Sequence, residues 1–312
     1  MVQPPSLKNL PRYPVTASVG GAALAVTIMW WSGRDIDPFI MNARVWEKWE
    51  LWRALTSTLP HVNFFHLAFN LYWLWALGTF VERVYGHLRL AGIILLLALG
   101  SSLAEFALFY GGVGLSGVGY GLWGMLWVLE QHDARFAEAM DRQTSQMFVV
   151  WFFLCIALTL TDVMPVANVA HGAGAGIGAL LGLAASAQGP VKWASSAGLA
   201  AVAILTLAGA TVFWPWINLS KNAQPEVEHA GVEALERADN SKAVKLLEIS
   251  ARMRKAPARA WYNLGVAYER LGRHEDAAAA FEHAAQMPDA TSEYRQAAEA
   301  LRYLAGKNRK RR

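Results

Sequence analysis

Cysteine and charged residues are both scarce in this chain. Cys155 is the one cysteine among 312 residues, which excludes an intramolecular disulfide and a metal cluster held by several cysteines. Only 17% of the residues are charged, against about 25% in ordinary soluble domains, whereas 54% are hydrophobic. The sequence also lacks an HExxH motif and paired aspartates in its apolar segments, so neither a zinc nor an aspartyl hydrolase of the membrane is supported. We therefore expect no metal and no cofactor.

The charges that are present are unevenly distributed along the chain. Residues 1–220 contain few of them, and they become dense from Lys221 onward, which predicts a domain boundary at that point. The first apolar run begins near Pro14 without a clean A-x-A site, so no cleavable signal is expected. The basic tail 307–312 is either a solvated terminus or a segment that contacts phosphate or acidic lipid.

Seven apolar segments approach the length of about 20 residues that a helix needs to cross a bilayer. They lie near residues 15–33, 63–82, 89–110, 115–130, 147–162, 166–187 and 194–216. The loops 110–115 and 162–166 carry neither Lys nor Arg, which favours a cytoplasmic N-terminus. The basic residues that this orientation places in the cytoplasm are Lys8, Arg12, Arg83, Arg89, Arg135, Arg142 and Lys192.

A serine and a histidine lie inside two of these apolar segments, far apart in the chain. Ser116 follows Gly114 and Leu115 in a glycine-rich run, and His171 opens another such run. Polar and ionisable side chains at membrane depth are costly and usually functional. A nucleophile and its general base are the simplest pair that would justify that cost.

The second apolar segment supplies further polar groups. His66 and Asn70 are four residues apart and therefore share one face of a helix. Together with Ser116 and His171 they provide the groups that acyl transfer requires. Ser116 would be the nucleophile and His171 the base, while His66, Asn70 and nearby backbone amides would donate hydrogen bonds to the oxyanion.

Glycine pairs accompany the serine and the histidine. Gly117 and Gly121 are four residues apart in the fourth segment, as are Gly174 and Gly178 in the sixth. Small residues at this spacing let two helix backbones approach closely. Such an approach is needed if Ser116 is to share a hydrogen bond of about 2.6–3.2 Å with a base on another helix. The alternative is that these glycines serve helix packing alone, as in many transporters.

In combination these motifs resemble the rhomboid family of intramembrane serine proteases over about residues 15–187. Trp52-Arg53 is similar to the Trp-Arg pair of the family's first loop, and Gly78, Glu82 and Arg83 to the end of its second helix. Tyr120 occupies the place of an aromatic residue packed against the catalytic histidine. The motifs that carry the resemblance are His61-x4-His66-x3-Asn70, Gly114-x-Ser116-Gly117 and Ala170-His171-x2-Gly174-x3-Gly178.

The resemblance implies a role for each matching residue. Ser116 would be the nucleophile and His171 the general base of a dyad without a carboxylate. The oxyanion site would be lined by the side chains of His66 and Asn70 and by the backbone amides of Ser116 and Leu115. His61 would orient its neighbours rather than react. The implied substrates are single-pass membrane proteins, cut in or near a helix that can unwind.

Residues 222–306 show an internal period of 34 that resembles tetratricopeptide repeats. A shift of 34 aligns Gly231 with Gly265, and about two repeats plus a capping helix fit into the segment. Such stacks usually bind a protein or peptide on their concave face. Two repeats could instead form a small docking or dimerising unit. The residues that match the repeat pattern are Trp261, Leu264, Gly265, Tyr268, Ala277, Phe281 and Ala284.

The expected architecture is an all-α, multi-pass membrane protein with a small helical domain at its C-terminal end. We expect an N-terminal tail (1–14), a six-helix rhomboid core (15–187), a linker with a seventh transmembrane helix (188–220), a tetratricopeptide-like domain (221–306) and the basic tail (307–312). A bacterial plasma membrane is preferred because no organelle transit peptide is evident. No nucleic acid partner is expected. Two other functions stay open, namely a catalytically silent relative that binds membrane clients and a polytopic transporter.

Overall fold

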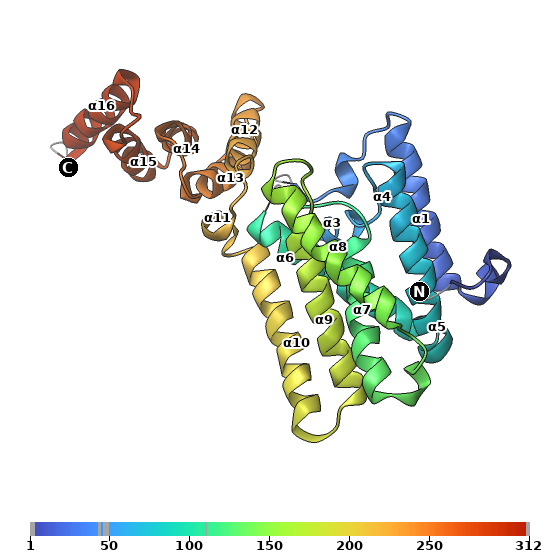
Figure 1. The fold of residues 1–312 in the computed structure, drawn as a ribbon. Helices are drawn as coiled ribbons and strands as arrows, with labels where there is room; N and C mark the ends of the chain where they lie inside the picture. The colour runs from blue at the N-terminus through green and yellow to red at the C-terminus, as the bar shows by residue number, and fades with distance from the viewer. Residues whose placement is uncertain (1–3, 43–44, 46–49, 110, 310–312) are drawn as a thin grey trace. The chain divides into compact units, whose positions relative to one another are not determined.

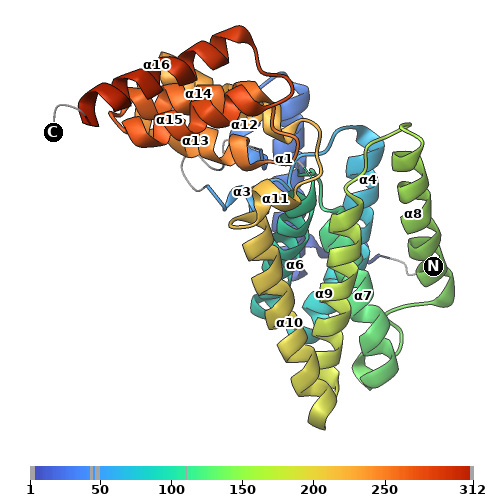
Figure 2. The same ribbon diagram turned by 90° about the vertical axis from the view of Figure 1, so that its left-hand side faces the viewer.

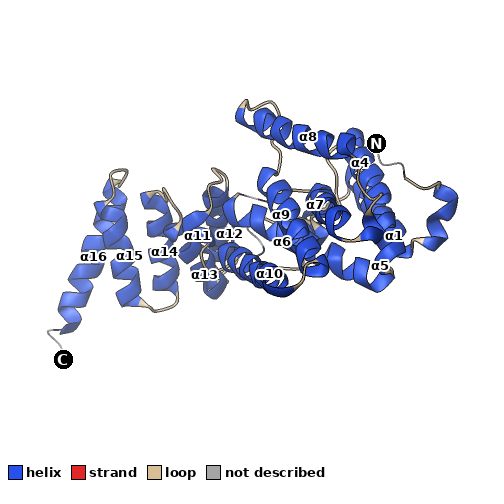
Figure 3. Cartoon of the chain, turned by 60° about the horizontal axis from the view of Figure 1, so that its bottom comes forward, coloured by secondary structure: helices blue, strands red, loops and turns tan. Residues whose placement is uncertain are grey.

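The computed structural model describes residues 4–42, 45, 50–109 and 111–309, and the side chains of these residues as far as residue 300. The described residues form helices, turns and loops without a strand (Figure 3), which confirms the all-α prediction. They divide into two compact units, one of residues 1–41 and 51–212 and the other of residues 42–50 and 213–312. The side chains of the basic tail 307–312 lie outside the described part.

The first unit is a bundle of long helices (Figure 1). The second predicted span is one apolar element, in which the π-helical turn η3 (Leu74–Gly78) joins α4 (Phe64–Trp73) to α5 (Thr79–Tyr85). Shorter elements are η1 (Leu7–Arg12), η2 (Asp37–Phe39), α3 (Arg53–Thr56) and η4 (Ala134–Phe136). The other long helices are α1 (Pro14–Trp31), α6 (His87–Leu108), α7 (Ser116–His132), α8 (Arg142–Leu160), α9 (Asn168–Ser186) and α10 (Gly189–Ala210).

Each predicted span coincides with one of these elements to within a few residues. In the described part of the chain, six helices are long and apolar enough to cross a membrane, and α7, with 17 residues, falls just below that length. The last span begins and ends earlier than predicted. Gly189 with φ +59° and Pro190 start α10, because proline suits the first turn of a helix. The non-helical backbone of Thr211 ends it.

The outer surface of this bundle is apolar. Large side chains on several helices are between 66% and 90% exposed, among them Phe65, Leu88, Leu160, Ile204 and Leu205. A water-soluble monomer rarely exposes so much contiguous apolar surface, whereas a bilayer solvates it. The outward-facing side chains and the long apolar helices together indicate an integral membrane protein.

Helix α7 lies at the centre of the bundle, because it contacts α4, α6, α8 and α9. Figure 2 shows it beside α9. Its side chains Leu122, Met125, Leu126 and Leu129 are almost completely buried. This burial explains how a helix with so many glycines is held in place, since its apolar side chains contribute the packing that its glycines lack. The residue at the start of α7 is thereby fixed within the bundle.

The second unit contains α11 (Trp214–Ile217) and the helices α12 (Ala223–Glu236), α13 (Asn240–Arg252), α14 (Ala258–Arg270), α15 (His274–Gln286) and α16 (Ser292–Arg309). α13 and α15 begin at Asn240 and His274, and α14 and α16 at Ala258 and Ser292, so both pairs repeat at the predicted period of 34. A Cβ added at Gly265 would lie 2.8 Å from the Phe281 ring, and one at Gly231 2.7 Å from Leu247. The aligned glycines therefore make the same helix crossing in each repeat.

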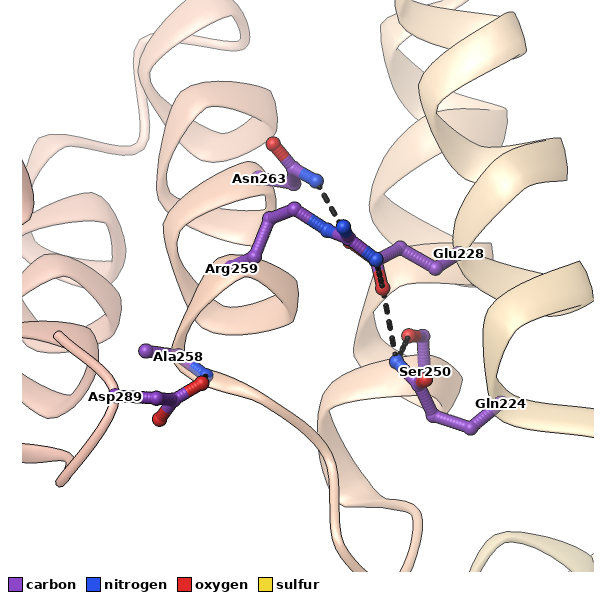
Figure 4. A network of polar contacts seen from close by, with 7 residues as sticks. All are labelled: Gln224, Glu228, Ser250, Ala258, Arg259, Asn263 and Asp289. Atoms are coloured by element: carbon purple, nitrogen blue, oxygen red, sulfur yellow. Dashed lines mark hydrogen bonds and ion pairs between the residues drawn. The ribbon is translucent and has the colours of Figure 1, made fainter. Parts of the chain in front are cut away.

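A buried carboxylate links the repeats of the second unit (Figure 4). Glu228 on α12 is 2% exposed, and it accepts hydrogen bonds from Arg259 at 2.7 Å and from Asn263 at 3.0 Å on α14. Gln224 donates to Glu228 and also to Ser250 on α13. A buried charge is tolerated only when it is paired and hydrogen-bonded in this way. The network therefore fixes the stacking of α12 on α14.

The apolar residues after α10 belong to the second unit rather than to the last span. Trp214 is fully buried, and α11 packs against α13. This boundary lies before the charge break at Lys221. Composition alone cannot distinguish apolar residues that pack inside a helical unit from those that face a membrane. The predicted ranges 15–187, 188–220 and 221–306 remain proposals for the domain limits.

Candidate active site

Ser116 is the first residue of α7, and the preceding loop sets its position. Gly114 has φ +107°, a conformation that side chains other than glycine rarely adopt. A Cβ at Gly114 would also lie 2.6 Å from the ring of His66 and 3.3 Å from that of His61. Glycine is thus required here both by the backbone and by the two imidazoles. The Ser116 side chain at the end of this turn is half-buried.

His171 lies in the first turn of α9 and meets Ser116 directly. The distance between His171 Nε2 and Ser116 Oγ is 2.8 Å, which is within hydrogen-bond range. His171 is 3% exposed, and its Nδ1 has no hydrogen-bond partner among the described residues. If Nε2 accepts the hydroxyl proton, Nδ1 must carry the N–H of the neutral ring. The structure therefore brings the two predicted residues together as a pair without a carboxylate.

Tyr120 holds the plane of the histidine ring. The two rings are stacked with centroids 4.6 Å apart and an interplanar angle of 29°. The Tyr120 hydroxyl donates to the carbonyl of Phe148 on α8 at 3.1 Å, which fixes the tyrosine in turn. An aromatic stack thus orients an imidazole whose Nδ1 is not held by a hydrogen bond.

The glycine pairs allow α7 and α9 to touch backbone to backbone. A Cβ at Gly174 would lie 2.1 Å from the Gly117 carbonyl oxygen, and one at Gly178 1.9 Å from that of Gly121. No side chain could be accommodated at either position without separating the helices. The close crossing brings the start of α7 to the first turn of α9, where Ser116 and His171 lie.

His66 and Asn70 lie on α4, on the side of the loop before Ser116. His66 reaches the loop at Gly114, and its Nδ1 has no partner among the described residues. Asn70 is 5% exposed, and its Nδ2 donates to the His66 carbonyl at 2.8 Å. One of the two Nδ2 hydrogens is therefore used within α4. Both residues stay candidates for the oxyanion site.

The Leu115 amide does not match its expected role in the oxyanion site. Its N–H donates to His61 Nε2 at 3.2 Å, while His61 Nδ1 donates to the Leu59 carbonyl at 2.9 Å. His61 is fully buried and joins the loop before α4 to the loop before α7. The Leu115 N–H is thus already satisfied by an imidazole. The amide of Ser116 stays available, because the first N–H groups of a helix have no acceptor within it.

Of the Trp-Arg pair, Arg53 binds the first loop of the bundle. Arg53 is 7% exposed and donates to the carbonyls of Asp37 and Ile40, the latter at 3.2 Å. Its guanidinium also lies 3.8 Å from the Asp37 carboxylate. Trp52 is 55% exposed, so its side chain is not part of the buried core. The structure thus supports a role for Arg53 in folding this loop.

Sequence reasoning missed Glu105, which lies beside the start of α9. This carboxylate on α6 is 5% exposed, and it accepts a hydrogen bond from the Ala170 N–H at 2.9 Å. The N-cap residue of α9 is Ala167, which provides no side-chain cap. Glu105 therefore caps α9 from a neighbouring helix, immediately before His171. A carboxylate in an apolar segment was the available signal.

Replacing Glu105 by Ala is expected to slow the reaction of Ser116 with a fluorophosphonate by about 10- to 100-fold. The uncapped first turn of α9 would shift, and displacements of about 1 Å cost rates of this order. Glu105→Gln should retain most of this reactivity, because its amide oxygen still accepts from Ala170. Labelling rates of the two variants, with thermal unfolding measured beside them, test this role. Equal rates for Glu105→Ala and the unaltered protein would contradict it.

Comparisons with known proteins match two separate parts of the chain. Residues 48–188 match the rhomboid domain family, and residues 230–292 match a tetratricopeptide repeat family. The chain is 33% identical to Rhomboid protease GlpG of Pectobacterium atrosepticum over 175 residues. The similarity spans 54% of this chain and 61% of that relative's length. Both residues of the Ser116–His171 pair fall within the matched domain. The chain is therefore an all-helical membrane protein that carries a rhomboid domain followed by a tetratricopeptide region.

Proposed function

We propose that this protein is an intramembrane serine endopeptidase that uses Ser116 and His171 as a dyad. The observation that carries the proposal is the 2.8 Å contact between His171 Nε2 and Ser116 Oγ inside an apolar bundle. Such a contact is the geometry that a nucleophile and its general base require. The similarity to a rhomboid protease over the same domain supports the same activity.

The proposed reaction follows from the position of each group. His171 Nε2 takes the proton of Ser116 as Oγ attacks the carbonyl carbon of the scissile bond. The oxyanion accepts hydrogen bonds from His66, from the remaining N–H of Asn70 and from the Ser116 amide. His171 then gives the proton to the leaving amine. Water, activated by the same histidine, hydrolyses the acyl enzyme and releases the second product.

The proposed substrates are membrane proteins with a single transmembrane helix. A peptide bond in such a helix is protected, because its backbone groups are hydrogen-bonded within the helix. The substrate must therefore unwind locally before Ser116 can reach its carbonyl carbon. Entry from the bilayer between α4 and α8 is consistent with their contact, which includes the stacked rings of Phe69 and Trp151 at 5.2 Å. Aromatic side chains can separate without breaking backbone hydrogen bonds.

The second unit is proposed to bind a protein or peptide partner. Its helix pairs repeat at the period of tetratricopeptide stacks, whose usual role is such binding. The specific partner would be recognised by exposed side chains on the repeats. A docking or dimerising role is the alternative.

A fluorophosphonate that reacts with activated serines tests the proposed function. The purified full-length protein should form one covalent adduct, and peptide mapping should place it on Ser116. A catalytically silent relative that binds membrane clients would fold and bind in the same way but would form no adduct. An adduct on another residue would also contradict the proposal.

A further inference from the structure

A groove opens on the bundle at the end of α7 that is far from Ser116. It has a volume of about 450 Å³, and α6, α7 and α9 form its walls together with residues near η4. Ser116 is the first residue of α7, and the residue of this helix that lines the groove is Met125, nine positions later. At 1.5 Å per residue the two lie about 14 Å apart along the helix axis. The groove is thus separate from the candidate active site.

Two arginines form the rim of this groove. Arg89, near the start of α6, is exposed and has no hydrogen-bond or ion-pair partner among the described residues. Arg135, in η4, is bound to Asp133 at 2.7 Å, so that its charge is partly neutralised. Its guanidinium carbon also lies 5.4 Å from the centre of the Tyr85 ring, which lines the same groove. The rim therefore carries one uncompensated positive charge and further N–H donors.

The walls of the groove become apolar with depth. Ile93 and Leu96 follow Arg89 on α6, about 6 Å and 10 Å further along the helix axis. Leu181 on α9 also lines the groove. Gly92 leaves the groove open, because a Cβ at that position would meet no atom within 4 Å. The groove thus combines a cationic rim at the end of the bundle with an apolar interior inside it.

We propose that this groove binds an anionic phospholipid. The phosphate would lie between Arg89 and Arg135, and one acyl chain would lie along Ile93, Leu96 and Leu181. Guanidinium groups suit phosphate oxygens because they offer several N–H donors in a fixed plane. The apolar walls offer nothing to a free phosphate ion but match a lipid chain. The unpaired charge of Arg89 favours an anionic headgroup over a zwitterionic one.

Native mass spectrometry of the full-length protein tests this site with phosphatidylglycerol and phosphatidylcholine of identical chains. The unaltered protein should bind phosphatidylglycerol more tightly. Arg89→Gln should reduce that preference about fivefold, as expected for one cation at a lipid headgroup. The control is Lys192→Gln, because Lys192 is an exposed cation near the start of α10 that does not line the groove. It should leave the preference unchanged.

A second variant tests the place of the acyl chain. Gly92→Leu should fill the groove and lower the binding of both lipids several-fold, while thermal unfolding in detergent shows that the bundle is intact. Inorganic phosphate at millimolar concentration should not displace the lipid. Displacement by phosphate would overturn the proposal in favour of a free-anion site. An unchanged preference in Arg89→Gln, or unchanged binding in Gly92→Leu, would also overturn it.

Discussion

Replacing Ser116 by Ala is expected to abolish cleavage of a transmembrane substrate, with a loss in kcat of at least about 10⁴-fold. The reason is that Ser116 Oγ is the proposed nucleophile, and residues of a catalytic unit typically carry losses of this size. His171→Ala should cause a loss of the same order, because its Nε2 lies 2.8 Å from that oxygen. The measurement is the cleavage rate in vesicles that contain the purified protein and a model single-pass substrate.

The matched control for Ser116→Ala is Ser195→Ala on α10. Ser195 is 4% exposed, and its hydroxyl donates to the Val191 carbonyl of its own helix at 2.8 Å. Removing that hydroxyl should leave the cleavage rate nearly unchanged. Unchanged cleavage in Ser116→Ala would remove this serine from the mechanism. It would then favour another function for the bundle, such as transport.

Replacing Gly178 by Ala is expected to destabilise the bundle by about 2 kcal/mol or more and to reduce cleavage in parallel. Overpacking at a tight contact usually costs about 1–3 kcal/mol. The new Cβ would lie 1.9 Å from the Gly121 carbonyl oxygen, and backbone cannot rotate away as a side chain can. α7 and α9 would therefore move apart, and with them Ser116 and His171.

Gly176→Ala is the control for Gly178→Ala, two residues away on the same helix. Gly176 is exposed, and a Cβ there would meet no atom within 4 Å. Alanine is favoured over glycine in a helix by up to about 1 kcal/mol, so this variant should be as stable as the unaltered protein or more so. Thermal unfolding in detergent and cleavage rates measure both effects. Equal stability of the two variants would show that the α7–α9 crossing is looser than the structure implies.

The sequence predicted the site because polar and ionisable side chains are costly at membrane depth and are therefore usually functional. A serine and a histidine in separate apolar segments predict a functional pair, and the nearby glycines predict a close helix crossing. The structure places Ser116 against His171 and the Gly174–Gly178 pair against the carbonyls of α7. The repeat of the second unit could also be predicted, because residues at the same packing positions recur every 34 residues.

Contacts between distant segments could not be predicted in this way. The acceptor of the Leu115 amide is His61, 54 positions earlier, and no local pattern indicates that pairing. Glu105 caps a helix that begins 63 residues after it. Arg89 and Arg135 form one rim only because the start of α6 lies beside the segment that follows α7. Each of these contacts depends on how the helices pack rather than on the residues of one segment.

The most direct test of the central claim measures how fast Ser116 reacts with a fluorophosphonate when His171 is replaced by Ala. The serine is still present in this variant, so the labelling rate reports its activation by the histidine. The account predicts that labelling slows by at least about 10³-fold, while Gly176→Ala leaves it unchanged. Labelling of Ser116 at the unaltered rate in His171→Ala would show that the two side chains do not share a proton, and it would contradict the account.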